Sequence, residues 1–246
     1  MELTTATWTD VRDADARVGL VPVGATENHG PHAPLGTDVV AAEAVAATVA
    51  DREGIVLAPP IHVGISEEHR AFDGTLWVSP DAFRAYVGDV GRSLAAWVDA
   101  VVFVNGHGGN VAALHEVAAR LARDDACHAV PFTWFEAVDA GPSMGHAGPR
   151  ETALLRAVGP ELVREDRVEA ADENAANRWG EWAGNTNLAH DSDEFAPNGV
   201  VGDPTAGDAT LGNRLLEEAE TALDDLLDAV ERRLDDRDTD ADDDPT

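Results

Sequence analysis

The sequence predicts a three-layer α/β/α sandwich with a mostly parallel central sheet. Apolar runs typical of strands alternate with segments of helical periodicity, which is the pattern of an α/β domain. The strand runs are continuously apolar, as strands covered on both faces are. The length of 246 residues suits one such domain. We therefore expect a single folded domain at residues 1–234 and an acidic, disordered tail at 235–246.

Local signals place the elements along the chain. Ser79 as an N-cap before Pro80 is typical of a helix start. Pro131 lacks a backbone N–H, so its strand is expected at an edge or with a bulge. Strands are expected at residues 18–23, 55–61, 100–104 and 129–135. Helices are expected at residues 37–51, 79–98, 110–123, 151–158 and 208–234. Residues 170–198 lack periodicity and are interpreted as a long functional loop or flap.

The charge balance excludes several classes of partner. The formal net charge is −30, and all 17 basic residues are arginine. A field of this sign repels nucleic-acid phosphates and anionic membranes, so neither is expected as a partner. An acidic surface of this kind is typical of proteins from a high-salt, halophilic cytoplasm. With no apolar run of membrane-spanning length and no secretion signal, we expect a cytoplasmic protein. Cys127 is the single cysteine, which excludes an intrachain disulfide.

Residues of metal-ligand type follow the expected strands. In an open α/β sheet, ligands bind beyond the carboxyl ends of the strands. Carboxylates and imidazoles together suit Zn²⁺, Mn²⁺ or Fe²⁺, and this number of them suffices for two ions that share a bridging carboxylate. The candidates after the first, third and fourth strands are Glu27, His29, Asp38, His107, His146 and Glu151.

Each of these residues has an ordinary structural explanation when taken alone. His107 in a glycine-rich turn could cap that turn, and His146 could bond only to the backbone. Their joint position at successive strand ends is what favours a metal site. The glycines around His107 fit neither nucleotide-binding pattern, and the absence of lysine further excludes a phosphate loop.

Three blocks of sequence resemble the creatininase family of amidohydrolases. Residues 22–38, 105–110 and 146–152 are similar to three signatures of that family in the same order, with weaker similarity at 59–75 and 197–204. The resemblance covers roughly residues 18–230 and implies the three-layer fold, a catalytic domain and a homo-oligomer.

The resemblance also implies a role for each candidate residue. Glu27, Asp38 and His107 would hold one divalent ion of Zn, Fe or Mn. A second ion would be held by His29, the bridging Asp38 and Glu151. His146 would pass a proton to the leaving nitrogen while metal-activated hydroxide attacks the carbonyl.

The branch of the family decides the expected substrate. Creatinine-hydrolysing members carry a glutamate where this chain has Gly109, which argues against creatinine. The Gly-Gly-Asn form resembles archaeal deformylases of a formylaminopyrimidine nucleotide in riboflavin and F420 synthesis. It also resembles peptidases that trim the mycofactocin precursor peptide. We favour the deformylase, because the salt-adapted composition fits an archaeal host, and keep the peptidase as the alternative.

Other functions remain as further alternatives. Creatinine hydrolysis and another dinuclear-metal hydrolase, such as a phosphoesterase, are possible in principle. The net charge of −30 disfavours a phosphate ester as substrate. A non-catalytic scaffold is disfavoured because every expected ligand is present. We therefore expect a small-molecule or short-peptide substrate.

Overall fold

A parallel sheet forms the middle layer of the computed structural model, which describes residues 1–242. Its strand order within these residues is β2-β1-β3-β4. The strands are β1 (Val18–Val23), β2 (Ile55–Leu57), β3 (Ala100–Asn105) and β4 (His128–Thr133). Strands β1 and β3 pair in parallel from Val18 opposite Ala100 to Val23 opposite Asn105. Every residue of both strands is buried, as their continuous apolar sequence predicts.

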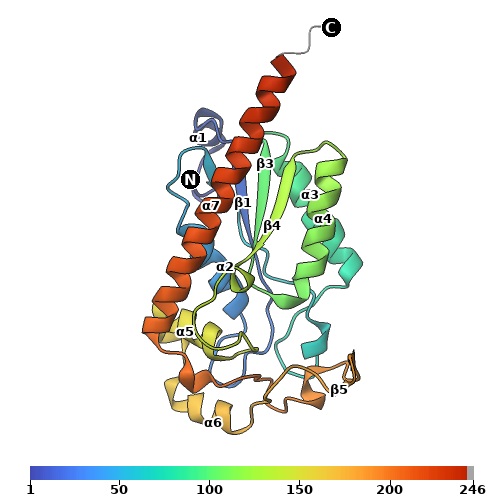
Figure 1. The fold of residues 1–246 in the computed structure, drawn as a ribbon, viewed down its shortest axis with the longest axis vertical. Helices are drawn as coiled ribbons and strands as arrows, with labels where there is room; N and C mark the ends of the chain where they lie inside the picture. The colour runs from blue at the N-terminus through green and yellow to red at the C-terminus, as the bar shows by residue number, and fades with distance from the viewer. Residues whose placement is uncertain (243–246) are drawn as a thin grey trace.

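Helices cover both faces of the sheet, so the predicted three-layer fold is confirmed (Figure 1). Side chains alternate along β3: Val102 and Val104 pack with one helical layer, and Val101 and Phe103 with the other. The first layer contains α2 (Thr37–Ala47), α5 (Pro149–Val158) and α7 (Ala209–Asp242). The second contains α3 (Pro80–Leu94) and α4 (Val111–Arg123).

Two expected strands end earlier in the structure, β2 because of proline and β4 because the 3₁₀ turn η3 (Trp134–Glu136) follows it. Strand β2 ends at Leu57 rather than at residue 61, because Pro59 and Pro60 cannot donate to a ladder. Strand β4 ends at Thr133, and Pro131 is accommodated because β4 is the edge strand of the order β2-β1-β3-β4. The edge position predicted for that proline is therefore confirmed.

Residues 170–198 are more structured than the expected loop. Helix α6 (Val168–Glu173) begins the segment, and strands β5 (Trp182–Ala183) and β6 (Thr186–Asn187) form a small antiparallel hairpin. These elements are too short to leave a periodic signal in the sequence. Figure 1 shows α6 and β5 gathered at one end of the molecule, at the bottom of the view. Helix α1 (Trp8–Asp13), with its Thr7 capping box, was also not predicted.

The last helix extends past the domain boundary that we expected at residue 234. Helix α7 continues to Asp242, through the first part of the expected tail. An ion pair of 2.7 Å between Arg17 and Asp235 ties this extension to the domain, and a formed helix adds one bond for each further residue. Residues 243–246 of the predicted tail lie outside the described residues. None of the described helices has the length and hydropathy needed to span a bilayer.

Candidate metal centre

The six predicted site residues converge beyond the carboxyl ends of three strands. Glu27, His29 and Asp38 follow β1, and Asp38 lies in the first turn of α2. His107 follows β3 directly, and the chain after β4 brings in His146 and Glu151, the latter in the first turn of α5. All six are buried, with exposed fractions of 8% or less. Charged groups at such burial require partners or ions.

Asp38 lies between two histidines. Its Oδ1 is 3.0 Å from Nε2 of His29, and its Oδ2 is 3.2 Å from Nδ1 of His107. On the first side, Glu151 Oε1 lies 3.5 Å from His29 Nε2. On the second, Glu27 Oε1 lies 3.2 Å from His107 Nδ1. The carboxylate of Asp38 therefore joins two groups of ligand atoms, which is the arrangement of a bridging ligand.

Several of these atoms have no hydrogen-bond partner among the described residues. The unpartnered atoms are Glu27 Oε1 and Oε2, His29 Nε2, Asp38 Oδ2 and Glu151 Oε2. Among the described residues, three sets offer ligand atoms within 4.8 Å of one another. They are Glu27–Asp38–His107, His29–His146–Glu151 and Glu27–His69–His146. Converging acceptors that lack donors fit divalent cations, so the residues present fit the implied metals.

The backbone fixes which nitrogen of each histidine faces the centre. His107 Nε2–H donates to the carbonyl of Ile65 at 2.7 Å, and His29 Nδ1–H donates to that of Glu27 at 3.2 Å. His146 Nε2–H donates in the same way to Asn28 at 2.7 Å. A carbonyl can only accept, so in each neutral ring the other nitrogen turns its lone pair inward. Such outer hydrogen bonds orient metal-ligating histidines.

Burial and neighbouring charges shift the pKa values of Glu27 and Asp38, the two carboxylates beside His107, in opposite directions. Burial raises the pKa of Glu27 to about 7, and Asp38 adds to this effect while His107 opposes it. Burial would also raise the pKa of Asp38, but His29 and His107 outweigh it and lower that pKa below the ordinary value. In the absence of metal ions, Asp38 is therefore the ionised member of the pair, and Glu27 is the member that retains a proton more readily.

The histidines fall into two classes. Burial opposes a charge on each, yet Asp38 with Glu151 raises the pKa of His29 well above its ordinary value, and Glu27 with Asp38 does the same for His107. At His146, burial and the nearby His29 lower the pKa to about 4. The carboxylates around His29 and His107 thus favour a positive charge at these two rings, whereas His146 stays neutral.

His69 is a further residue of the centre that the site prediction missed. Its side chain is 1% exposed, and Nε2 lies 3.7 Å from Glu27 Oε1. Its ring stacks on that of His146 with centroids 4.4 Å apart. His69 lies in the 3₁₀ turn η1 (Glu67–His69) of the connection after β2, whereas the sequence candidates came only from the connections after the first, third and fourth strands. The Ser66–His69 run did stand out in the sequence, as part of a weaker family match.

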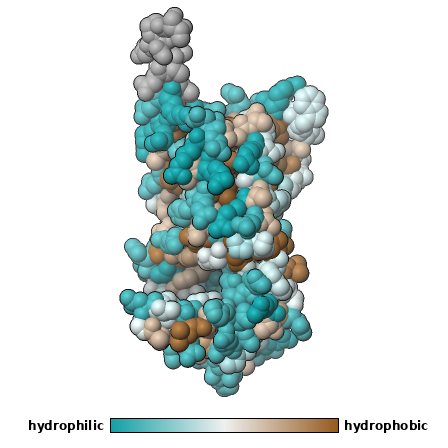
Figure 2. All heavy atoms as spheres, turned by 90° about the vertical axis from the view of Figure 1, so that its right-hand side faces the viewer, coloured by the Kyte–Doolittle hydropathy of each residue, from teal (hydrophilic) through white to brown (hydrophobic). Residues whose placement is uncertain are grey.

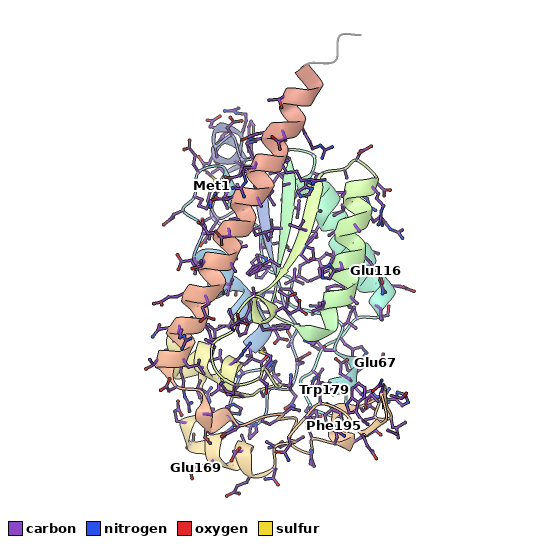
Figure 3. The ribbon with its side chains drawn as sticks, in the orientation of Figure 1. Met1, Glu67, Glu116, Glu169, Trp179 and Phe195 are labelled. Carbon is purple, nitrogen blue, oxygen red and sulfur yellow. The ribbon has the colours of Figure 1, made fainter. Side chains whose placement is uncertain are left out.

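A cavity of about 380 Å³ opens onto the centre. Glu27, Asp38 and His107 lie in its wall, and Phe135, Met144 and Trp179 provide apolar surface. Trp179 comes from the segment interpreted as a flap, and its ring lies 5.7 Å from that of His146. Figure 3 shows Trp179 beside Phe195, and their centroids are 5.1 Å apart. The segment therefore provides one wall of the cavity.

Two glycines allow the chain to pass close to the ligands. A Cβ at Gly106 would lie 2.1 Å from the backbone oxygen of Asp38. A Cβ at Gly109 would lie 2.2 Å from the oxygen of Ile65 and 2.5 Å from Nε2 of His107. Any side chain at residue 109 would disturb the hydrogen bond that orients His107.

Comparison of the sequence with known proteins gives a consistent family. The family model described as creatininase, creatinine amidohydrolase, matches residues 4–227. The mycofactocin precursor peptide peptidase of Mycobacterium ulcerans is 39% identical over 231 residues, which cover 87% of this chain and 84% of the relative. The creatinine amidohydrolase of Pseudomonas putida is 29% identical over 195 residues, or 66% of this chain and 73% of the relative.

Solved structures share the fold. A crystal structure of creatinine amidohydrolase superposes with a TM-score of 0.77 at 24% identity, covering 92% of this chain and 96% of the other. A structure described as creatininase Mn gives the same TM-score of 0.77 at 22% identity, covering 92% and 96%. At these identities the likeness establishes the shared fold.

Proposed function

Because the chain belongs to the creatininase family, a family of amide-bond hydrolases, we propose that it is a metal-dependent peptidase acting on a precursor peptide. The support is the similarity to mycofactocin precursor peptide peptidases, which reaches 39% identity over 84% of the relative's length. A second such peptidase, from Mycolicibacterium smegmatis, is 37% identical over 79% of its length. The sequence alone favoured the deformylase over the peptidase. The similarity now favours the peptidase, because these relatives are peptidases and give no support to the deformylase.

The geometry at residue 109 supports the exclusion of creatinine. The family resemblance implies a glutamate at this position in creatinine-hydrolysing members. In this chain, even a Cβ there would meet Ile65 and His107 at less than 3 Å. The backbone around His107 therefore has no room for the additional carboxylate, and the cavity wall at this point is bare backbone.

The shape and lining of the cavity suit a peptide. A volume of about 380 Å³ accommodates more than a single small ring, and it lies within the usual range for ligand sites. Phe135, Met144 and Trp179 offer apolar contacts for a side chain. The described residues that line this cavity include no arginine, so an anionic phosphate group of a nucleotide has no counterion there.

The proposed mechanism assigns each residue a task. Glu27, Asp38 and His107 would hold one divalent ion, and His29, Asp38 and Glu151 the other. When bound, such ions polarise a carbonyl and lower the pKa of water toward about 7. His146 Nδ1, with its lone pair turned inward, accepts a proton from the attacking water and delivers it to the leaving nitrogen.

An assay of three substrate classes tests this proposal. Metal-free protein is reloaded with Zn²⁺, Mn²⁺ or Fe²⁺ and incubated with short peptides, creatinine and a formylaminopyrimidine. We expect mass spectrometry to show cleavage of a peptide bond and no turnover of creatinine. Turnover of creatinine or of the formyl compound alone, with no peptide cleaved by any metal form, would overturn the peptidase assignment.

We also infer a salt-adapted homo-oligomer with a cytoplasmic location. Figure 2 shows a face that is mostly hydrophilic, and the net charge is −30. Trp8 and Trp97 are nevertheless exposed and line one surface pocket with Leu3, and such an apolar cluster suits a subunit contact. Light scattering tests the oligomeric state, and thermal unfolding in rising KCl tests the salt adaptation. A monomer at every salt concentration, or a Tm that falls with added salt, would contradict them. Fractionation of source cells tests the location.

A further inference from the structure

We propose that His69 is a second catalytic histidine, whose Nε2 accepts a hydrogen bond from the N–H of the scissile amide. This inference rests on the proposed amide hydrolysis and adds to it a residue that recognises the leaving nitrogen. It is carried by the position of His69 in the cavity wall and by the hydrogen bonds that fix its ring.

Ser192 determines which nitrogen of His69 carries the proton. The Ser192 hydroxyl donates to the carbonyl of Glu68 at 3.0 Å, which uses its single hydrogen. The same oxygen lies 3.0 Å from Nδ1 of His69, so it must accept there, and Nδ1 carries the hydrogen. Both residues are 1% exposed, so water does not compete for these bonds. Nε2 is therefore left with a free lone pair.

That lone pair faces the reacting side of the centre. His69 Nε2 and His146 Nδ1 are each 3.7 Å from Oε1 of Glu27, and both rings line the cavity. With Glu27 engaged by its ion, the two ring nitrogens are neighbouring acceptors, and neither has a donor of its own on this side. A group that brings N–H hydrogens to this point satisfies them. The leaving nitrogen, which His146 protonates, is such a group.

The segment that contains Ser192 is itself anchored to the turn of His69. Arg70 Nη2 lies 2.7 Å from the carboxylate of Asp191. Glu194 accepts from the backbone N–H of His190 and of Asp191, each at 2.8 Å. The orientation of His69 is thus held by contacts on both sides of Ser192, which fits a positioning role for that serine.

Amide hydrolysis has a use for such an acceptor that ester hydrolysis lacks. Water adds its oxygen to the carbonyl carbon, and its proton passes to His146. The C–N bond then breaks with its electron pair on nitrogen, which takes the proton from His146 to leave as an amine. As nitrogen turns pyramidal, its original N–H swings out of the amide plane and needs an acceptor. His69 provides that acceptor and ends the cycle unchanged, whereas an ester oxygen carries no hydrogen to accept.

The protonation of His69 is measurable without any substrate. In the zinc-loaded protein with ¹⁵N-labelled histidine, the ¹⁵N shift separates a protonated, a metal-bound and a free ring nitrogen. We expect a free Nε2 at His69. A protonated Nε2 would overturn the proposal, and a metal-bound Nε2 would overturn it in favour of a third ion. Ser192→Ala should abolish the single tautomer, while Ser192→Thr keeps the hydroxyl and serves as the control.

Kinetics complete the test once the assay above has identified a cleaved peptide. His69→Leu should lower kcat/KM for that peptide about tenfold while leaving a depsipeptide ester of the same sequence nearly unaffected. His115→Leu, on the exposed face of α4, should change neither rate. An equal loss for amide and ester would contradict the proposal. If no peptide is cleaved, the peptidase assignment fails, and the tautomer still decides the role of His69.

Discussion

His29 and Asp38 meet in the buried centre, with Nε2 of the histidine 3.0 Å from Oδ1 of the aspartate. His29 lies in the loop after β1, and Asp38 lies at the start of α2, which follows that loop. A short stretch of chain therefore supplies both partners. The second oxygen of Asp38 faces His107, which lies at the end of a different strand, β3. This one carboxylate therefore links ligands that are distant in the sequence.

Replacement of this bridging carboxylate should empty the centre. Asp38→Asn keeps the size of the side chain but removes the negative charge that two ions would share. We expect the metal content, measured by elemental analysis after Zn²⁺ loading, to fall from two ions per chain to less than one. Glu43→Gln, at an exposed position of the same helix, is the control. Retention of two ions by the Asp38 variant would remove the bridging role.

Loss of His146 should separate catalysis from metal binding. In our assignment this histidine, whose pKa is lowered to about 4 and whose outer nitrogen bonds to Asn28, moves a proton and holds no ion. His146→Ala should keep two ions per chain and lose about 10²–10⁴-fold in kcat. An undiminished kcat would take His146 out of the mechanism, and a loss of one ion would make it a ligand.

Two neighbouring glycines offer a matched pair of variants. A Cβ at Gly109 meets Ile65 and His107 at 2.2 and 2.5 Å, whereas a Cβ at Gly108 meets nothing within 4 Å. Gly109→Ala should cost about 1–3 kcal/mol of unfolding free energy and weaken metal binding, because His107 must shift. Gly108→Ala should leave both nearly unchanged. Equal stability of the two variants in chemical denaturation would show that the loop adapts freely.

The contact of Glu218 with the loop after β4 gives a stability that depends on pH. Glu218 Oε2 accepts from the backbone N–H of Ala140 at 2.9 Å and of Asp139 at 3.0 Å. These bonds lower the pKa of Glu218 below its ordinary value of 4.5. A lowered folded-state pKa means that the contribution is complete above pH 4.5 and disappears as the pH falls through the folded value.

Glu218→Gln isolates this contribution. The variant should be less stable than the parent protein at pH 7, and the difference should vanish at pH 3, as measured by urea unfolding at both values. Glu217→Gln, one residue earlier on the same helix, is the control and should show no such pH dependence. A difference that persists at pH 3 would assign the effect to something other than ionised Glu218.

The sheet and most of the centre could be predicted because their signals are local. The runs around Leu20 and Val102 are continuously apolar, which indicates strands buried on both faces, and each ligand follows such a strand or starts the next helix. Ligand-type side chains beyond strand ends then share one edge of the sheet.

Other parts of the site depend on tertiary contacts that leave no periodic signal. His69 lies in a three-residue turn, and its orientation depends on Ser192, which is 123 residues away in the sequence. Trp179 lies beside the hairpin β5–β6, whose strands have two residues each, too few to show alternation. The length of α7 was underestimated for a different reason, because its acidic end resembles a disordered tail in composition.

Anomalous diffraction from crystals of the zinc-loaded protein tests whether two ions share the carboxylate of Asp38. We predict two zinc peaks about 3.5–4 Å apart, both in contact with Asp38, one between Glu27 and His107 and one between His29 and Glu151. A single peak away from Asp38, or no peak at these residues in an active preparation, would contradict the dinuclear centre and the mechanism built on it.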